Sequence, residues 1–184
     1  MILFRKHYQE NNFLNQLINV LENELSGVDY SPVILCIGSD RHLQDCFGPL
    51  TGTMLSAVVP TATLMGTLDE PIHAKNLIRQ LAMIEELGKT RRIIALDAAL
   101  GNPEDIGVIQ LKKGSLLPGK ALGRRLPPVG DYALTGIVGS KIMGTEDKRF
   151  NSHSLGPVYH MANMISQSLA VWLSLEDDNK WFYE

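Results

Sequence analysis

The feature that most constrains the fold is a short apolar run that ends at a glycine and leads through an acidic loop into a helix. The run covers Val33 to Ile37 and stops at Gly38, and a helical pattern starts at Cys46 and continues to about Val58. The polar loop between them reads SDRHLQD. A strand, a loop and a helix in this order place the loop at the carboxyl edge of a sheet, where open α/β folds bind ligands.

Strands and helices continue to alternate along the chain, which predicts a mostly parallel sheet with helices on both faces. The apolar run around 107–111 follows a loop too short for a crossover helix, so antiparallel pairing at a sheet edge is expected there. The first ten residues are expected to form a loose end. Further strands are predicted at 61–66 and 92–96, a strand or the start of a helix at 129–138, and helices at 13–25, 74–87 and 155–175.

Composition indicates one α/β domain over residues 1–184, since 45% hydrophobic and 20% charged residues are ordinary for a globular chain. A formal net charge of -3 gives no general reason to expect nucleic acid or an anionic membrane as a partner. No apolar run approaches the roughly 20 residues of a membrane span. The N-terminus lacks a signal-peptide core and two cysteines suggest no disulfide framework, so a cytoplasmic protein is expected. A homo-oligomer is left open.

Two aspartates, Asp45 and Asp97, each follow a predicted strand and carry the main functional hypothesis. If the two strands are neighbours, both carboxylates face one crevice. Two close carboxylates share a proton more easily than both ionise, so the pKa of one of them rises. Such a pair can activate water and protonate a leaving amine, or hold a metal ion. The structural alternative is a helix cap for Asp45 and a turn former for Asp97.

Other polar side chains near the same edge are candidates for contact with a substrate or a metal. Asp40 and Arg41 lie in the acidic loop, where Asp40 is also a typical turn residue and Arg41 could clamp a substrate carboxylate. His73 follows the second strand together with Asp69 and Glu70. This cluster could hold a metal, or the two acids could simply favour the start of a helix.

Several other chemistries are disfavoured. The chain has no G-x-S-x-G nucleophile elbow, no G-x-G-x-x-G fingerprint and no P-loop. Acids in the first loop would repel a phosphate, so a nucleotide-binding domain is disfavoured despite the fold class. A thiol nucleophile at Cys46 is disfavoured because Asp45 beside it raises the thiol pKa, and no histidine or asparagine is placed by the sequence as its base.

Four segments of the chain resemble the YyaC family of sporulation proteins, to which spore protease activity is ascribed by similarity. More distantly, the same layout is similar to the spore germination protease and the hydrogenase maturation endopeptidases. The resemblance implies a phosphorylase/hydrolase-like, three-layer α/β/α sandwich with a mostly parallel, partly mixed sheet of about five strands. The segments read CIGSDRHLQDCFGPLTGTML, GTLDEPIHAKNL, IIALDAALG and VGDYALTGIV.

The resemblance also implies roles for single residues. Asp45 matches the acidic loop of the germination protease, and Asp97 matches its second proposed catalytic aspartate, which ends a strand in an Ile-Asp-Ala context. In the hydrogenase maturation enzymes the corresponding acids bind metal together with a histidine that precedes a Thr-Gly pair. Here Leu134 precedes Thr135, so that histidine is missing, and Asp131 is the nearby acid that could substitute for it.

These observations predict an endopeptidase-like hydrolase of sporulating bacteria, in which Asp45 and Asp97 activate water against a peptide carbonyl. The Gly-rich segment from Gly114 to Gly123, within a longer loop or flap, is expected to bound the cleft. No metal ligand is assigned, and a divalent ion is left open. The alternative is a non-catalytic scaffold that kept the protease fold and binds a peptide or protein partner. Substrate contacts are predicted for Asp40, Arg41, His73 and Asp131.

Overall fold

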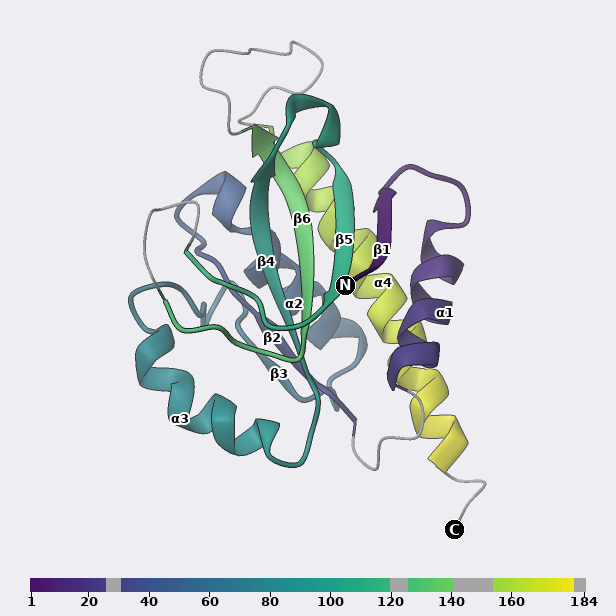
Figure 1. The fold of residues 1–184 in the computed structure, drawn as a ribbon, viewed down its shortest axis with the longest axis vertical. Coiled ribbons are helices and arrows are strands. Elements are labelled where there is room, and N and C mark those ends of the chain that lie inside the picture. Colours follow the sequence, from purple (N-terminus) through teal and green to yellow (C-terminus); the bar gives the residue numbers. More distant parts are fainter. Residues whose placement is uncertain (26–30, 120–125, 141–153, 181–184) are drawn as a thin grey trace.

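The computed structural model describes residues 1–25, 31–119, 126–140 and 154–180. Figure 1 shows the arrangement of the helices and strands. None of the helices in these residues has the length and apolar character needed to cross a membrane. The elements in chain order are β1 (Ile2–His7), α1 (Phe13–Leu25), β2 (Val33–Cys36), the 3-10 turn η1 (Leu43–Asp45), α2 (Phe47–Val58), β3 (Leu64–Met65), α3 (Leu77–Gly88), β4 (Ile93–Gly101), the 3-10 turn η2 (Pro103–Asp105), β5 (Val108–Lys113), β6 (Tyr132–Ser140) and α4 (Leu155–Lys180).

The six strands form one mixed sheet in the order β1-β5-β6-β4-β2-β3. β3, β2, β4 and β6 run parallel to one another, and β5 runs antiparallel to both of its neighbours. The prediction of a mostly parallel, partly mixed α/β sheet is therefore confirmed, with six strands in place of about five. The predicted antiparallel direction of the strand near 107–111 is also confirmed.

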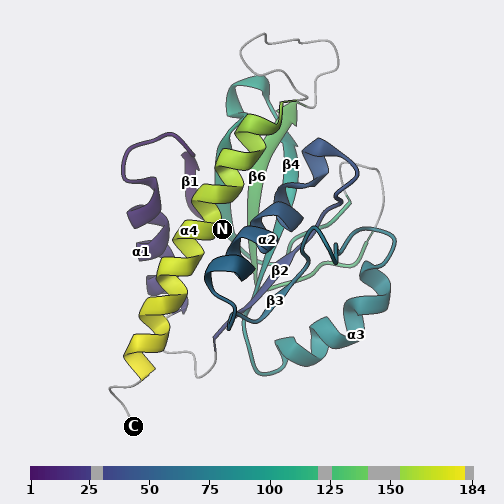
Figure 2. The same cartoon turned by 180° about the vertical axis from the view of Figure 1, so that it is seen from behind.

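The two faces of the sheet are covered unequally. Of the described helices, α1, α2 and α4 pack behind the sheet, and α3 covers part of the front (Figures 1 and 2). Side-chain alternation along β4 serves both layers, since Ile94 and Leu96 join the core behind the sheet and Ile93 and Ala95 join the α3 core. None of the helices in the described part of the chain lies in front of β6, β5 and β1 in Figure 1.

The N-terminal residues are not a loose end, and that prediction was wrong. They form β1, which pairs antiparallel with β5, so β5 is not the edge strand that was predicted. Phe4 is buried, and its ring meets the ring of Phe13 edge-on with the centroids 5.1 Å apart. The sequence does not show this pattern, because the apolar run Met1–Leu3 precedes Phe4, the basic Arg5 and Lys6 follow it, and Phe4 is the one buried residue of the strand.

Several strands differ from their predicted extents, and β3 is reduced to Leu64–Met65 from a predicted strand at 61–66. β4 continues past Asp97 to Gly101, so Asp97 lies inside a strand and does not follow one. The segment from 129 onward, predicted as a strand or the start of a helix, contains β6. Part of the predicted flap, at 120–125, and nearly all of the loop predicted after Lys141 lie outside the described residues.

The connections around β2 create a crevice at the carboxyl end of the sheet. The chain leaves β2 through α2 to reach β3 on one side of it, and then passes through α3 to reach β4 on the other side. Because the two crossovers run in opposite directions, α2 and α3 lie on opposite faces of the sheet, as Figures 1 and 2 show. β2 and β4 are therefore neighbours across a topological switch point, the place where open α/β sheets bind ligands.

Candidate active site

The acidic loop after β2 is closed by backbone hydrogen bonds that position Asp45. The Ser39 N–H donates to the Asp45 carbonyl at 2.9 Å, and the Gly38 N–H donates to the Ile72 carbonyl at 2.8 Å. Gly38 has a φ of +147°, and a Cβ added there would lie 2.0 Å from the Asp45 carbonyl oxygen. Only glycine fits this close approach. The strand therefore turns sharply enough to hold Asp45 against the end of the sheet.

The Asp45 side chain does not cap helix α2. The N-cap position is Cys46, which makes no side-chain capping hydrogen bond, and Asp45 itself belongs to the turn η1. Within the described part of the chain the Asp45 carboxylate makes no hydrogen bond, and it lines a cavity. Because it lies just before the first turn of α2, the positive end of the helix dipole favours its ionised form.

Asp97 approaches the same cavity from the middle of β4. One of its carboxylate oxygens accepts a hydrogen bond from the Ala98 N–H at 2.8 Å. On the neighbouring strand β6 its direct partner is Thr135. Asp97 is therefore not a turn former, because both its backbone and its cross-strand pairing belong to a continuous strand.

The electrostatics of Asp45 and Asp97 are coupled. Burial, reinforced by the negative charge of Asp45, raises the pKa of Asp97 to about 8 from an ordinary value of 3.8, although the Ala98 N–H works in the opposite direction. Burial also raises the pKa of Asp45, while the charges of His42 and His73 lower it. The two carboxylates therefore favour a state in which Asp97 holds a proton and Asp45 is ionised.

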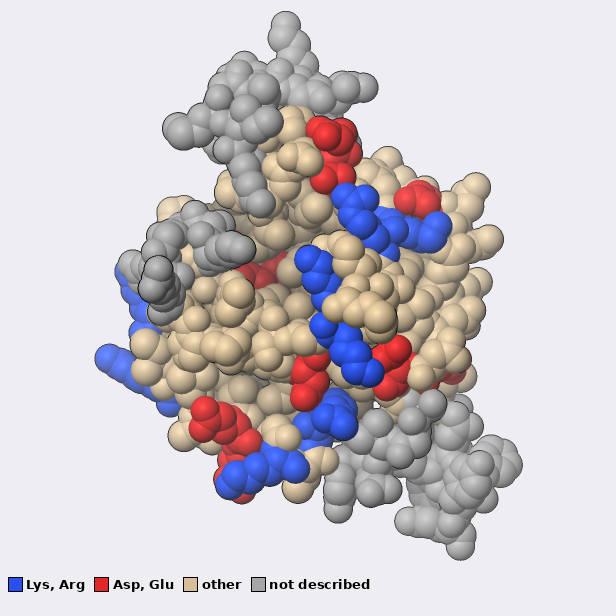
Figure 3. Space-filling view, viewed as in Figure 1, with Lys and Arg blue, Asp and Glu red and all other residues tan. Residues whose placement is uncertain are grey.

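The cavity that contains both aspartates has a volume of about 810 Å³ and lies on the front of the sheet. In Figure 3 a hollow on this face has acidic atoms at its base and a line of Lys and Arg side chains along one side. The described part of the Gly-rich segment bounds the cavity through Ser115, Leu116, Leu117 and Gly119, and residues 120–125 lie outside the description.

A polar row crosses the floor of this cavity and was missed by sequence reasoning. Asp97 on β4 pairs with Thr135 on β6, Thr135 with Gln110 on β5, and Gln110 with Arg5 on β1. Directly paired residues on adjacent strands present their side chains on the same face. All four residues line the cavity, together with Lys112. The alternation of side chains within each strand indicates which polar residues share a face. The order of the strands is what brings these four residues into one row.

Of the other predicted site residues, His73 acts on the aspartate pair through its charge. It is partly buried, its charge lowers the pKa of Asp45, and it lines a second cavity of about 630 Å³ beside β3 and α3. The hydrogen bond from Gly38 to Ile72 explains this position, because it ties the residue before His73 to the start of the acidic loop. Asp40 and Arg41 are exposed and line neither of these two cavities.

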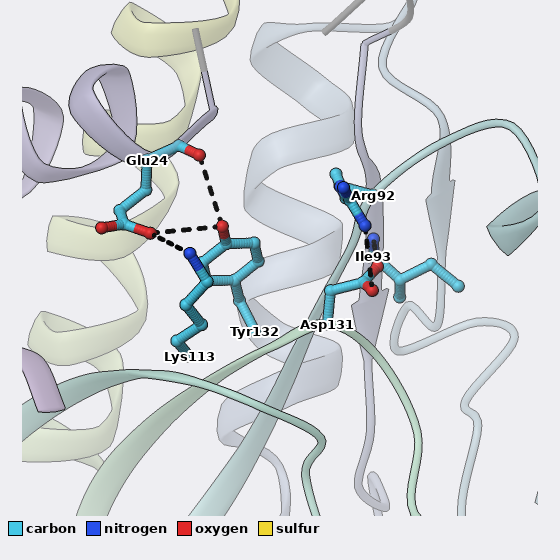
Figure 4. A network of polar contacts seen from close by, with 6 residues as sticks. All are labelled: Glu24, Arg92, Ile93, Lys113, Asp131 and Tyr132. Carbon is cyan, nitrogen blue, oxygen red and sulfur yellow. Dashed lines mark hydrogen bonds and ion pairs between the residues drawn. The ribbon is translucent and has the colours of Figure 1, made fainter. Parts of the chain in front are cut away.

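Asp131 is not brought together with Asp45 and Asp97. It precedes β6 at the opposite end of the sheet, where its carboxylate accepts a hydrogen bond from the Ile93 N–H at 2.9 Å and faces Arg92 at 3.6 Å. Ile93 precedes Asp97 by four residues in a strand, a separation of about 13 Å. Figure 4 shows this contact at the start of β4. Asp131 therefore fastens the start of the strand and does not replace a missing site histidine.

Figure 4 also shows a second polar group beside the start of β6. The Tyr132 hydroxyl donates to the Glu24 backbone carbonyl at 3.3 Å, and Lys113 donates to the Glu24 carboxylate at 3.0 Å. Tyr132 belongs to the core behind the sheet, whereas the cavity lies in front. This group joins helix α1 to the sheet and takes no part in the candidate site.

The structure also disfavours a thiol nucleophile. Cys46 is buried, and its S–H donates to the Leu43 carbonyl at 3.0 Å. Burial and the charge of Asp45 both raise the pKa of the thiol. A thiol held in this way is largely protonated and weakly nucleophilic near neutral pH.

The donor set does not fit a three-ligand metal centre. The described residues hold no group of three or more His, Cys, Asp or Glu side chains arranged to bind one ion. Asp69 is exposed, and Glu70 and His73 line the second cavity, so they do not join Asp45 and Asp97 around one point. A catalytic metal site needs about three protein ligands. We therefore derive no step through a metal ion.

Comparisons with known proteins agree with the resemblance that the motifs predicted. The family described as "Protein of unknown function (DUF1256)" matches residues 5–168. The chain is 36% identical over 172 residues to "Uncharacterized protein YyaC" of Bacillus subtilis (strain 168), covering 92% of this chain and 81% of that protein. The chain therefore belongs to the DUF1256 family and is a relative of YyaC.

The fold is similar to that of a solved protease. The crystal structure of a [NiFe] hydrogenase maturation protease, HycI from Thermococcus kodakarensis KOD1, matches with a TM-score of 0.56 and 20% sequence identity. The match covers 84% of this chain and 99% of that one. At this level of identity the similarity establishes a shared fold, and the predicted likeness to the hydrogenase maturation proteases is confirmed to that extent.

Proposed function

We propose that this member of the DUF1256 family hydrolyses peptide bonds with Asp45 and Asp97 as the catalytic pair. The observation that carries the proposal is their placement in one cavity, where the charge of Asp45 raises the pKa of Asp97. The similarity of the fold to a maturation protease supports a peptide or protein as the substrate. The family resemblance of the two aspartate motifs supports the same roles.

The two aspartates divide the work of a general base and a general acid. Asp45, ionised, takes a proton from a water molecule as the water oxygen attacks the peptide carbonyl carbon. Asp97, protonated, gives its proton to the carbonyl oxygen, which forms a neutral gem-diol. When the gem-diol collapses, the carbon–nitrogen bond breaks, Asp45 returns its proton to the leaving amine, and Asp97 recovers a proton from a gem-diol hydroxyl. Both residues end in their starting states.

The cellular setting is part of the same proposal. The four motif segments resemble a family of sporulation proteins, which supports a role in sporulating cells. Both cysteines, Cys36 and Cys46, are free and buried. Unpaired cysteines in the core are typical of a reducing compartment, which supports the cytoplasm.

Cleavage of a complex peptide mixture tests the proposed activity. The protein would be incubated with peptides from a digested bacterial proteome, and new amino termini would be labelled and identified by mass spectrometry. Asp45→Asn and Asp97→Asn should each reduce cleavage by about 100-fold or more, because each removes a proton-transfer group. Asp40→Asn, an exposed aspartate of the same loop, is the matched control and should cleave like the wild type. Equal cleavage by all four proteins would refute the proposal.

The second candidate function is a peptide-binding scaffold without catalysis. It is favoured by the lack of a histidine where the metal-binding maturation enzymes carry one, since Leu134 before Thr135 is buried in the core behind the sheet. A scaffold would retain peptides from the same mixture and produce no new termini. Binding without cleavage by the wild-type protein would therefore select this function.

A further inference from the structure

We propose that Lys112 selects peptides that carry a carboxylate about three residues from the scissile bond. This inference rests on the proposed function, because it names the class of peptide that the same cavity would hold. It concerns the end of the cavity away from Asp45 and Asp97, formed by β5 and β1.

The strand order sets the distance between the two ends of the cavity. β5 lies two strands away from β4, with β6 between them, which corresponds to about 10 Å across the sheet. Lys112 pairs with Ala133, and Ala133 pairs with Ala95. Lys112 therefore lies on the same face as Asp97, offset by two residues along the strands. An extended peptide advances about 3.3 Å per residue. A peptide whose carbonyl meets the aspartates would therefore bring a side chain about three residues away beside Lys112.

Among the described residues at that end of the cavity, Lys112 is the cation available to a ligand. Arg5 also lines the cavity, but its guanidinium is paired with Asp105. Lys112 is exposed and has no acidic partner among the residues whose placement is described. Its neighbour Lys113, by contrast, is paired with Glu24. A ligand carboxylate can thus pair with the Lys112 ammonium without breaking an existing ion pair.

The remaining charges favour a single carboxylate over a more highly charged anion. The ionised Asp45 lines the same cavity, so a doubly charged phosphate group would meet stronger repulsion from the acidic end than a single carboxylate would. Gln110 and Thr135 lie between the ends and can hydrogen-bond to peptide amides. The cavity therefore suits an extended peptide with one acidic side chain or a terminal carboxylate at the Lys112 end.

Binding of three synthetic peptides to an inactive variant tests this inference. The peptides are acetylated, amidated octamers of one alanine and serine sequence that carry Glu, Gln or Lys at one central position. Asp97→Asn is the host protein, because asparagine mimics the protonated aspartate and prevents cleavage. Dissociation constants are read from the NMR shifts of the Gln110 and Thr135 amides. We expect the Glu peptide to bind about fivefold more tightly than the Gln peptide, and the Lys peptide to bind most weakly.

Charge reversal identifies the residue responsible. Lys112→Glu in the same host should invert the preference, so that the Lys peptide binds best. Lys89→Glu, a matched change just after α3 and outside the cavity, should leave the order Glu, Gln, Lys unchanged. Three outcomes would overturn the inference. They are equal binding of the three peptides, no binding of the Glu peptide at millimolar concentration, and the same effect from both lysine variants. A Glu preference that depends on Lys112, with no cleavage by the wild-type protein, would refute the proposed hydrolysis and retain Lys112 as the residue that binds the carboxylate of a bound peptide.

Discussion

Asp45 and Asp97 line one cavity from two different elements, and the negative charge of the first raises the pKa of the second. Asp45 reaches the cavity from a turn after β2, and Asp97 reaches it from within β4. The coupling between them is the property that distinguishes a working pair from two separate acids, and it can be measured without any knowledge of the substrate.

The titration of Asp97 should depend on Asp45. Carbon-13 NMR of the aspartate side-chain carboxyl groups should report a pKa of about 8 for Asp97 in the wild-type protein. Asp45→Asn should lower the pKa of Asp97, because it removes a like charge, but should leave it above 3.8, because burial is the larger cause. Asp40→Asn should leave the Asp97 titration unchanged. An Asp97 pKa that ignores Asp45→Asn would contradict the coupling.

Stability should depend on pH through the same carboxyl group. The folded protein binds the Asp97 proton more tightly than the unfolded chain does, so this contribution to stability is present below pH 3.8 and is lost as pH rises to about 8. A full shift would correspond to about 6 kcal/mol, and partial exposure of the side chain to solvent reduces this amount. The gain in unfolding free energy from Asp97→Asn should be larger at pH 9 than at pH 5 by about 2 kcal/mol, measured by urea denaturation. A gain independent of pH would show that Asp97 titrates normally.

The rate of peptide cleavage should fall at high pH. The proposed mechanism requires a protonated Asp97, so kcat/KM should decline as pH rises past about 8. It should also decline at low pH as Asp45 becomes protonated. Initial rates on the best peptide from the cleavage screen would provide the profile. A rate that keeps rising above pH 9 would exclude Asp97 as the general acid.

Gly38 should be essential for the placement of Asp45. Gly38→Ala puts a Cβ against the Asp45 carbonyl in a backbone conformation that alanine rarely adopts, so we expect a loss of about 3 kcal/mol in unfolding free energy. The matched control is Gly114→Ala, where φ is +118° but a Cβ would have no neighbour within 4 Å, and a loss of about 1 kcal/mol is expected.

Gly38→Ala should also move Asp45 and so lower the pKa of Asp97 toward its value in Asp45→Asn. Equal losses of stability for the two glycine variants, with an unchanged Asp97 titration, would show that the close approach is unimportant.

The sequence predicted the parts of the fold that depend on local periodicity. The apolar runs at β2 and β4 and the amphipathic stripes of α1 and α3 are readable because each element buries one repeating set of residues. β1 was not predicted, because Phe4 is its one buried residue, no alternating pattern surrounds it, and its burial depends on β5, more than a hundred residues away. The extent of β4 beyond Asp97 was missed for a similar reason, since its later residues pair with β6 and carry little pattern of their own.

By itself, the sequence determined the two halves of the candidate site, because Asp45 and Asp97 each stand near the end of a readable strand and carry recognisable local motifs. The tertiary structure decided which other residues share the cavity. The strand order places Arg5, Gln110 and Thr135 in one row with Asp97, and it removes Asp131 to the opposite end of the sheet. The physical reason is that strand register and neighbour order arise from long-range backbone pairing, and the local periodicity of a chain does not encode that pairing.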